Sequence, residues 1–591
     1  MRRPLSLLAI LAGLLLASPA DAGKVKVWFH HTAADYEKAK FDKAVVSNEG
    51  TLRLARALRL FADLDAAHIW DIVEDAAGNL IVATGDDGKL FRVGADGKAK
   101  LLVASKESQI LCLVRTPEGS VFAGTGPSGK ILKIDADGKD TVVADNLGKY
   151  VWSLVYDPAT KSLLAGTGPK GKIYRVGEGG KSSVFYASKQ DHILSLALDG
   201  GSVYAGTDRG GLVYRINADG KAFVLYHASQ NEVRALSAHN QVVFAGTSAP
   251  ASKRVPTTPN KSSPSPTPSS SSGGSVGAST GSDETKTKSA VEPSSGNTFA
   301  APDEKGSPAS APSSAGAGEN SLYRIASDGT VRELFRDKTL VLCLLRDGGR
   351  LYVGTGMQGQ LFEIDEATKE RIELARLDNG QIHCLLRRKD GSILLGTGDP
   401  GKIYVLEDRH VRRGDVVSEV LDAKLVSTWG ALSWKAETPA GTAVSVTVRT
   451  GNVALPDDTW SAWMPCVPDD DASARSKAPN ARYLQYRIEM TTDDPKRTPE
   501  VRQIAIRYRT NNQAPEITHL DVPDLDAVNL EQPKKFRIKW TATDPNEDEL
   551  TFDLYVKKAG WKDWVLLEEN LDKKDFDWDT TKTPSGMYRV K

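Results

Sequence analysis

The chain has 591 residues, enough for several domains of about 100–200 residues each. It carries 76 Lys and Arg against 76 Asp and Glu, so no net field recruits nucleic acid or an anionic membrane, and we expect no nucleic-acid partner. Only four cysteines occur, which excludes a disulfide-dense scaffold. The 52 Gly and 29 Pro favour many strands and turns over long helices, which predicts an all-β fold.

The N-terminus has the pattern of an export signal. Arg2 and Arg3 precede an apolar run over residues 5–16, and Ala20-Asp21-Ala22 follows as an A-x-A cleavage site. The run is shorter than the roughly 20 residues that span a bilayer. We therefore expect residues 1–22 to be a signal peptide cleaved after Ala22, a periplasmic or secreted protein, and no integral membrane segment.

A phrase of the form Gly-Thr-Gly-x-x-Gly, followed by an alternating strand, returns about every forty residues. Its threonines are Thr84, Thr125, Thr167, Thr207, Thr355 and Thr397. A seventh copy stops after Thr247 and resumes at Ser321. Each unit has the pattern of four short antiparallel strands, which is typical of a β-propeller blade. Seven units predict a seven-bladed propeller over residues 44–410.

The ends of the ring suggest how it closes. The fourth strand of the last unit is weak, whereas Leu52 and Leu54 follow a Gly turn and alternate like a strand. We predict that residues 51–54 form the outer strand of the last blade, because an N-terminal clasp removes an open sheet edge.

The broken copy contains an insertion at residues 249–320, rich in Ser, Pro, Thr, Gly and Ala. Such a composition buries too little apolar surface to offset the ordering entropy, which predicts a disordered loop projecting from blade five. It is either a tolerated low-complexity expansion or a flexible, O-glycosylated tether.

The repeat phrases resemble those of exported bacterial β-propellers with WD40-like, sensor-type repeats. The resemblance covers roughly residues 44–410, and it implies a fold but no particular activity. The His and Trp-Asp signature of WD40 blades and the Asp-box of sialidases are missing from the units. The phrases also imitate a P-loop, but Ile131, Ile173 and Ile403 stand where the metal-binding Ser or Thr would be. We therefore expect no cofactor.

The C-terminal third loses the repeat. Residues 414–510 alternate as strands around Trp429, Trp434, Trp460 and Trp463, and they resemble a jelly-roll β-sandwich of the discoidin-like or carbohydrate-binding type. These tryptophans are core residues or, if exposed, platforms for sugar rings. Residues 513–591 resemble a fibronectin type III-like module that lacks a strand, so we expect it to be incomplete. The acidic residues 544–549 form a solvated turn or a Ca²⁺ site.

The inner strands of the repeat place two sets of residues near the central channel. The residue before each inner strand belongs to the first set: His68, Gln109, Tyr150, His192, Glu232, Leu340 and Gln381. Two positions later stand the members of the second set: Trp70, Leu111, Trp152, Leu194, Arg234, Leu342 and His383.

The polar and aromatic members of the two sets are the candidate ligand-binding ring: His68, Trp70, Gln109, Tyr150, Trp152, His192, Glu232, Arg234, Gln381 and His383. The alternative is that they only cap a wet channel. His68 and His192 are three blades apart, too far for one ion, so we expect no metal site. No nucleophile–base pair or pair of carboxylates stands out, so we predict no catalytic residues.

These observations favour an exported, non-enzymatic binding or scaffold protein. Its partner would be a protein or a glycan, held by the propeller funnel or by the β-sandwich. Two alternatives remain open: a propeller lyase or hydrolase, and the extracytoplasmic sensor portion of a signalling receptor.

Overall fold

The computed structural model describes residues 25–591, except residues 86, 250–318, 471–472 and 523–534. The predicted signal peptide and nearly all of the predicted insertion lie outside the described residues. The described chain is built of strands, with three short 3₁₀ helices: η1 (Ala33–Tyr36), η2 (Glu178–Gly180) and η4 (Thr580–Lys582). None of its helices is long and apolar enough to cross a membrane.

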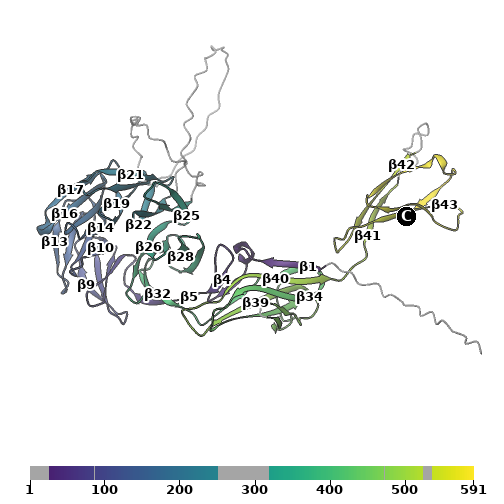
Figure 1. Cartoon of the computed structure of the whole chain (residues 1–591), viewed down its shortest axis with the longest axis horizontal. Helices are drawn as coiled ribbons and strands as arrows, with labels where there is room; N and C mark the ends of the chain where they lie inside the picture. Colours follow the sequence, from purple (N-terminus) through teal and green to yellow (C-terminus); the bar gives the residue numbers. More distant parts are fainter. Residues whose placement is uncertain (1–24, 86, 250–318, 471–472, 523–534) are drawn as a thin grey trace, which may run out of the picture.

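Seven four-stranded antiparallel sheets form the blades of a β-propeller (Figure 1). Blade 1 holds β6 (Ile69–Glu74), β7 (Leu80–Thr84), β8 (Lys89–Val93) and β9 (Ala99–Ala104). Blade 2 holds β10 (Gln109–Arg115), β11 (Val121–Gly126), β12 (Ile131–Ile134) and β13 (Asp140–Ala144). Blade 3 holds β14 (Tyr150–Asp157), β15 (Ser162–Gly168), β16 (Lys172–Val176) and β17 (Ser182–Ala187). Blade 4 holds β18 (Ile193–Asp199), β19 (Ser202–Thr207), β20 (Leu212–Ile216) and β21 (Ala222–His227).

The other three blades complete the seven-bladed propeller. Blade 5 holds β22 (Glu232–His239), β23 (Val242–Ala249), β24 (Asn320–Ile325) and β25 (Val331–Asp337). Blade 6 holds β26 (Val341–Asp347), β27 (Arg350–Thr355), β28 (Gln360–Asp365) and β29 (Arg371–Arg376). Blade 7 holds β30 (Gln381–Arg387), β31 (Ile393–Gly398), β32 (Lys402–His410) and β5 (Arg56–Asp63). In blade 5, β23 and β24 pair directly although 70 residues separate Ala249 from Asn320 in the numbering.

The threonine of the repeat closes a hairpin in every blade. Each of these side chains is buried, and its hydroxyl donates to the carbonyl at the start of the next strand, as Thr125 does to Lys130 at 3.2 Å. In blade 5 the same bond joins Thr247 to Ser321 across the insertion. In six blades a glycine precedes the threonine and leaves room for the neighbouring blade: a Cβ on Gly124 would lie 2.6 Å from Cys112 and 2.7 Å from Val151 of the next blade. The repeat therefore encodes both the hairpin and the contact between blades.

The strand that closes the ring is not the one predicted. β5 (Arg56–Asp63) pairs with β32 and supplies the outer strand of blade 7. Residues 51–54 instead contain β4 (Leu52–Leu54), which pairs with β3 (Ala44–Val46) and β40 (Glu500–Thr510). Leu52 and Leu54 are almost fully buried in that second sheet. Their alternation therefore indicates a strand that is buried in another domain. The propeller therefore begins with β5 at Arg56, and the predicted start at residue 44 is wrong.

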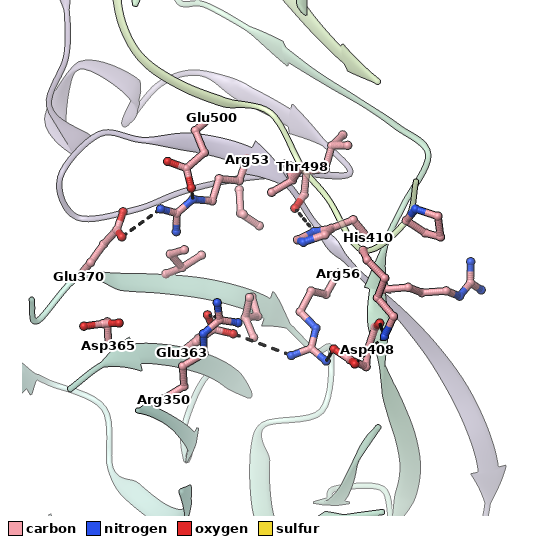
Figure 2. A pocket seen from close by; sticks show the side chains of 17 residues that line it. Arg53, Arg56, Arg350, Glu363, Asp365, Glu370, Asp408, His410, Thr498 and Glu500 are labelled. Atoms are coloured by element: carbon pink, nitrogen blue, oxygen red, sulfur yellow. Dashed lines mark hydrogen bonds and ion pairs between the residues drawn. The ribbon is translucent and has the colours of Figure 1, made fainter. Parts of the chain in front are cut away.

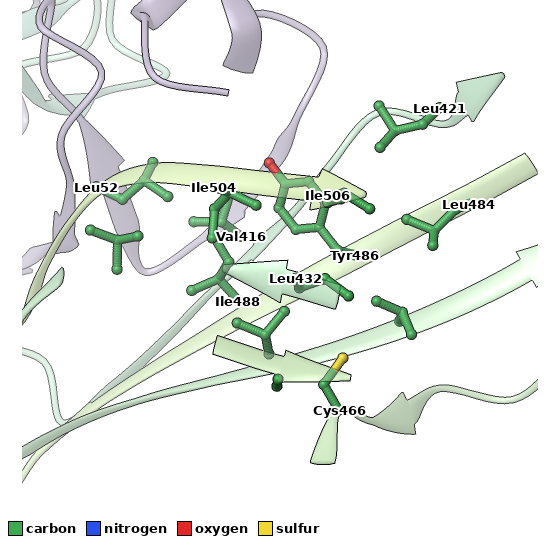
Figure 3. Close-up of a cluster of buried hydrophobic side chains, with 14 of the residues drawn as sticks. Leu52, Val416, Leu421, Leu432, Cys466, Leu484, Tyr486, Ile488, Ile504 and Ile506 are labelled. Atoms are coloured by element: carbon green, nitrogen blue, oxygen red, sulfur yellow. The ribbon is translucent and has the colours of Figure 1, made fainter. Parts of the chain in front are cut away.

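The second sheet has 12 strands, which come from the chain before the propeller and from the chain after it. The N-terminal part adds β1 (Val25–His30) and β2 (Lys40–Asp42) to β3 and β4. The later part comprises β33 (Arg413–Val417), β34 (Leu421–Glu437), β35 (Thr442–Gly451), β36 (Met464–Pro465), β37 (Val467–Asp470), β38 (Ser473–Arg475), β39 (Ala481–Thr492) and β40. Its core joins Leu52 to Val416, Leu432, Tyr486 and Ile504 (Figure 3). The propeller is thus inserted into the chain that forms this second sheet.

The described residues of the last domain form two three-stranded sheets. One contains β41 (Glu516–Asp521), β42 (Lys535–Thr543) and β45 (Asp575–Asp579), and the other contains β43 (Phe552–Lys558), β44 (Val565–Leu571) and β46 (Tyr588–Val590). Asn546, within the acidic turn, is buried, and its amide donates to Thr510 at 2.9 Å and to the Asn511 carbonyl at 3.0 Å. This part of the turn therefore ties the domain to the end of β40.

A set of ion pairs joins the propeller to the domain of the second sheet around a cavity of about 290 Å³ (Figure 2). Arg53 donates to Glu370 of blade 6 at 3.0 Å and to Glu500 of β40 at 2.8 Å. Burial would raise the pKa of Glu500, but Arg53 and Arg502 bring it below its usual value. Burial lowers the pKa of His410, whose ring contacts the Leu54 carbonyl. The charges of this junction largely satisfy one another, so it fixes the two domains together.

Candidate functional site

A channel of about 660 Å³ runs between the inner strands, and all seven blades line it. Every member of the second predicted set lines this channel: Trp70, Leu111, Trp152, Leu194, Arg234, Leu342 and His383. From the first set only Glu232, Leu340 and Gln381 do so, while His68, Gln109, Tyr150 and His192 lie outside the lining. The seven-fold repeat therefore brings the second set together as a ring and the first set only in part.

The residue directly after each member of the second set also lines the channel, and we call these seven residues the wall: Asp71, Cys112, Ser153, Ser195, Ala235, Cys343 and Cys384. Some of their side chains contact the backbone of the next blade. Ser195 donates to the Val233 carbonyl at 3.0 Å, and Cys112 contacts the Val151 carbonyl at 3.5 Å. Asp71 occupies this position in blade 1 and accepts from the Leu113 N–H of blade 2 at 2.7 Å. Burial raises the pKa of the Asp71 carboxyl to about 6, against which its hydrogen bonds from Leu113 and Ile72 act only partly. A neutral residue fills the wall in the other blades, so Asp71 is its one ionisable carboxyl.

The cysteines of the wall are not activated. Cys112, Cys343 and Cys384 are free thiols, and burial raises the pKa of each well above its usual value. A thiol that stays protonated is a poor nucleophile and a poor metal ligand.

Blade 5 contributes the charged part of the ring. Arg234 forms an ion pair with Glu232 at 3.2 Å, and Ser248 donates to the same carboxylate at 2.9 Å. Arg234 also contacts the Ser248 hydroxyl at 3.4 Å. The guanidinium is held in place by these contacts while it faces the channel.

Trp152 and His192 meet where blade 3 adjoins blade 4, and we call this pair the closed corner. The indole N–H of Trp152 donates to Nδ1 of His192 at 2.8 Å. Since an indole can only donate, His192 Nδ1 must be the accepting nitrogen and the ring proton must sit on Nε2. The Tyr150 ring also stacks on Trp152, with ring centroids 4.9 Å apart. The indole N–H of Trp152 and Nδ1 of His192 thus both have a hydrogen-bond partner.

His68, Trp70 and His383 meet where blade 7 adjoins blade 1, and we call this group the open corner. Trp70 and His383 have ring centroids 4.4 Å apart, and His68 is 5.4 Å from each. Nδ1 of His68, Nε1 of Trp70 and Nε2 of His383 are all buried and have no hydrogen-bond partner among the described residues. Burial, with smaller contributions from His68 and Arg234, lowers the pKa of His383 to about 3, so this imidazole is neutral at physiological pH.

The sequence prediction compared the wrong histidines. His68 and His192 were compared because both belong to the first set, and they are indeed on blades 1 and 4. His383 belongs to the second set on blade 7, but closure of the ring makes blades 7 and 1 neighbours. Pairing each second-set residue with the first-set residue of the following blade would have found His383 next to His68. Even so, no cluster of three or more His, Cys, Asp and Glu able to hold a metal occurs among the described residues.

The tryptophans in the domain of the second sheet divide between core and surface. Trp429 and Trp460 are buried, and each donates its indole N–H to a backbone carbonyl. Trp463 is half-buried, with the guanidinium groups of Arg449 and Arg487 lying 4.7 Å and 4.4 Å from its ring centroid. Its faces therefore carry arginine contacts, which makes it a weaker candidate for sugar stacking.

No family model matches the chain, and no curated protein sequence matches it either. Among solved structures, a streptogramin B lyase shares 12% identity at a TM-score of 0.42, over 59% of this chain and 97% of that one. The WD40 propeller domain of Doa1 shares 12% at 0.40, over 59% and 97%. The WD40 repeats of RRP9 share 11% at 0.41, over 60% and 99%. Values this low carry no argument about activity or partner, and the seven blades themselves establish the fold.

Proposed function

We propose that this is an exported binding or scaffold protein, which holds a protein or a glycan at the channel of its propeller. The observation that carries the proposal is the ring that opens into the 660 Å³ channel, with Trp70, Trp152 and Arg234 on three different blades. Trp and Arg are the residue types that dominate binding hot spots. Because the blades fix their backbones, these side chains are positioned before any partner arrives.

The thiols and Ser195 of the wall favour binding over catalysis. Its thiols stay protonated, and Ser195 donates to a backbone carbonyl, so neither group is activated. Glu232 is occupied by Arg234 and Ser248. A propeller lyase or hydrolase would need an activated group in this channel, and the sensor portion of a signalling receptor would use the same ring for recognition.

The test is to capture a partner with the purified chain. Glycan arrays and cross-linking to envelope proteins would be run with wild type and with a Trp70→Ala, Trp152→Ala, Arg234→Ala triple variant. Phe223→Ala is the matched control, because Phe223 is 62% exposed on the outer strand of blade 4. Each hot-spot residue contributes about 2 kcal/mol or more, so we expect the triple variant to lose at least a hundredfold in affinity and the control to lose none.

Three outcomes would count against the proposal. If a folded triple variant, checked by its thermal unfolding midpoint, binds its partner as tightly as wild type, the channel is not the binding site. If the partner is cleaved or rearranged during incubation, the enzyme alternative is correct. If the exported chain does not begin at Gly23 by mass spectrometry, the predicted cleavage after Ala22 is wrong.

A further inference from the structure

Two arginines of the second sheet share one tryptophan ring. The guanidinium carbons of Arg449 on β35 and Arg487 on β39 lie 4.7 Å and 4.4 Å from the ring centroid of Trp463. Gln485 lies opposite Arg449 in the strand register. Thr447 lies opposite Arg487 and two residues before Arg449, so these side chains belong to one face of the sheet. We call Arg449, Arg487 and Trp463 the arginine site.

Neither arginine has a carboxylate partner among the described residues. Arg449 donates from Nε and Nη2 to the neutral Oε1 of Gln485, at 3.0 Å and 2.6 Å. The guanidinium of Arg487 has no hydrogen bond or ion pair to any described residue. Glu489, two residues further along β39, forms its ion pair with Arg413. The described part of the chain therefore leaves two neighbouring positive charges uncompensated.

Another arginine of the same strand shows what compensation looks like. Arg482 donates from Nε and Nη2 to the two carboxylate oxygens of Asp422, at 2.8 Å and 2.9 Å. At the arginine site, by contrast, burial lowers the pKa of the Arg449 guanidinium, and the charge of Arg487 lowers it further. Charged groups that lose water on folding are normally paired, and an anion between the two arginines would relieve their repulsion.

The arginine site is rich in free hydrogen-bond donors. Arg487 offers its five N–H groups, and Arg449 keeps those of Nη1. The Thr447 hydroxyl is buried and has no hydrogen-bond partner among the described residues. Gln485 is already engaged, because its Oε1 accepts from Arg449 and its Nε2 donates to the Ser418 carbonyl at 2.7 Å. Positive charge combined with several free N–H donors is the arrangement that binds oxyanions.

We propose that Arg449 and Arg487 bind one oxyanion group of the sulfate, phosphate or carboxylate class. The group is either a free ion or a substituent of an acidic polysaccharide, since both present the same oxygens. Trp463 holds the two guanidinium groups by stacking, so less side-chain freedom is lost when the anion binds. The arginine site lies outside the propeller, so the proposal does not depend on the function proposed for the channel.

The experiment measures anion binding to the purified chain by calorimetry at constant ionic strength, with chloride as the balancing salt. One arm uses sodium sulfate, and the other uses dextran sulfate beside unsulfated dextran. We expect saturable binding, which Arg487→Gln and Arg449→Gln should each weaken at least tenfold. Arg487→Lys should weaken it less, because it keeps the charge and loses only the planar fork. Saturation by sulfate alone identifies a free ion as sufficient, and saturation only by dextran sulfate identifies the polysaccharide substituent.

Two controls separate the arginine site from a general attraction of anions. Arg507→Gln removes an exposed arginine of β40 in the same sheet and should leave binding unchanged. The Trp70→Ala, Trp152→Ala, Arg234→Ala variant should also bind as wild type does, so failure of the channel proposal would leave this one standing. Absence of saturable binding by wild type in both arms would overturn the proposal. Undiminished binding by a folded Arg487→Gln variant, or equal binding of dextran and dextran sulfate, would overturn it as well.

Discussion

The closed and open corners occupy equivalent places in one propeller and end in different states. At the closed corner Trp152 and His192 satisfy each other through a 2.8 Å hydrogen bond. At the open corner His68, Trp70 and His383 crowd together, and three ring nitrogens remain without a partner among the described residues. The repeat fixes where the side chains lie. The identity of one residue, Trp152 or His383, then decides whether the ring nitrogens of a corner have hydrogen-bond partners. Unsatisfied buried groups destabilise a fold, so the open corner costs stability that the closed corner retains.

The largest expected effect tests the neutral state of His383. Its pKa falls from 6.5 to about 3 on folding, chiefly through burial. Its contribution to stability is therefore complete above pH 6.5 and is lost as the pH falls toward 3, because the unfolded chain takes up a proton that the folded chain excludes. At about 1.4 kcal/mol per pH unit, the free energy of unfolding should fall by about 5 kcal/mol over the full window. Denaturant unfolding between pH 7 and pH 4.5 should already reveal about half of this.

Two substitutions check the origin of that slope. His383→Gln and His383→Trp both remove the titrating group, so each should flatten the pH dependence relative to wild type by the same amount. If only one of them does so, the slope comes from a structural change and not from protonation of His383.

The next effect concerns the wall beside each corner, where Asp71 follows Trp70 and Ser153 follows Trp152. Burial raises the pKa of Asp71 from 3.8 to about 6. The sign is opposite to that of His383: the contribution is complete below pH 3.8 and is lost as the pH rises to about 6, a change of about 3 kcal/mol. Asp71→Asn should therefore gain stability relative to wild type by up to that amount between pH 4 and pH 7, measured by denaturant unfolding. Ser153→Asn, the control in blade 3, should show no pH-dependent difference from wild type.

The sequence predicted the scaffold better than the corners. The threonine phrases located every blade, because each threonine closes a hairpin through a local bond that spans five residues or, in blade 5, an insertion. The closing strand was misplaced because alternation at Leu52 and Leu54 says that a face is buried, and not which domain buries it. The Arg53 junction joins residues 317 and 447 positions apart, so no local pattern could reveal it. The meeting of His68 with His383 required both the closure of the ring and the offset between the two sets.

The smallest effect isolates the hydrogen bond that separates the two corners. Trp152→Phe removes an indole N–H that His192 accepts, so a buried nitrogen loses its partner. Trp70→Phe removes an indole N–H that has no partner among the described residues, so it removes an unsatisfied group. Both substitutions also shrink a ring in the channel, and this common term cancels when the two are compared. Trp152→Phe should therefore lower the free energy of unfolding by about 1–2 kcal/mol more than Trp70→Phe, in denaturant unfolding at pH 7.5. Equal losses would mean that the Trp152–His192 bond adds no net stability and that the two corners differ in geometry alone.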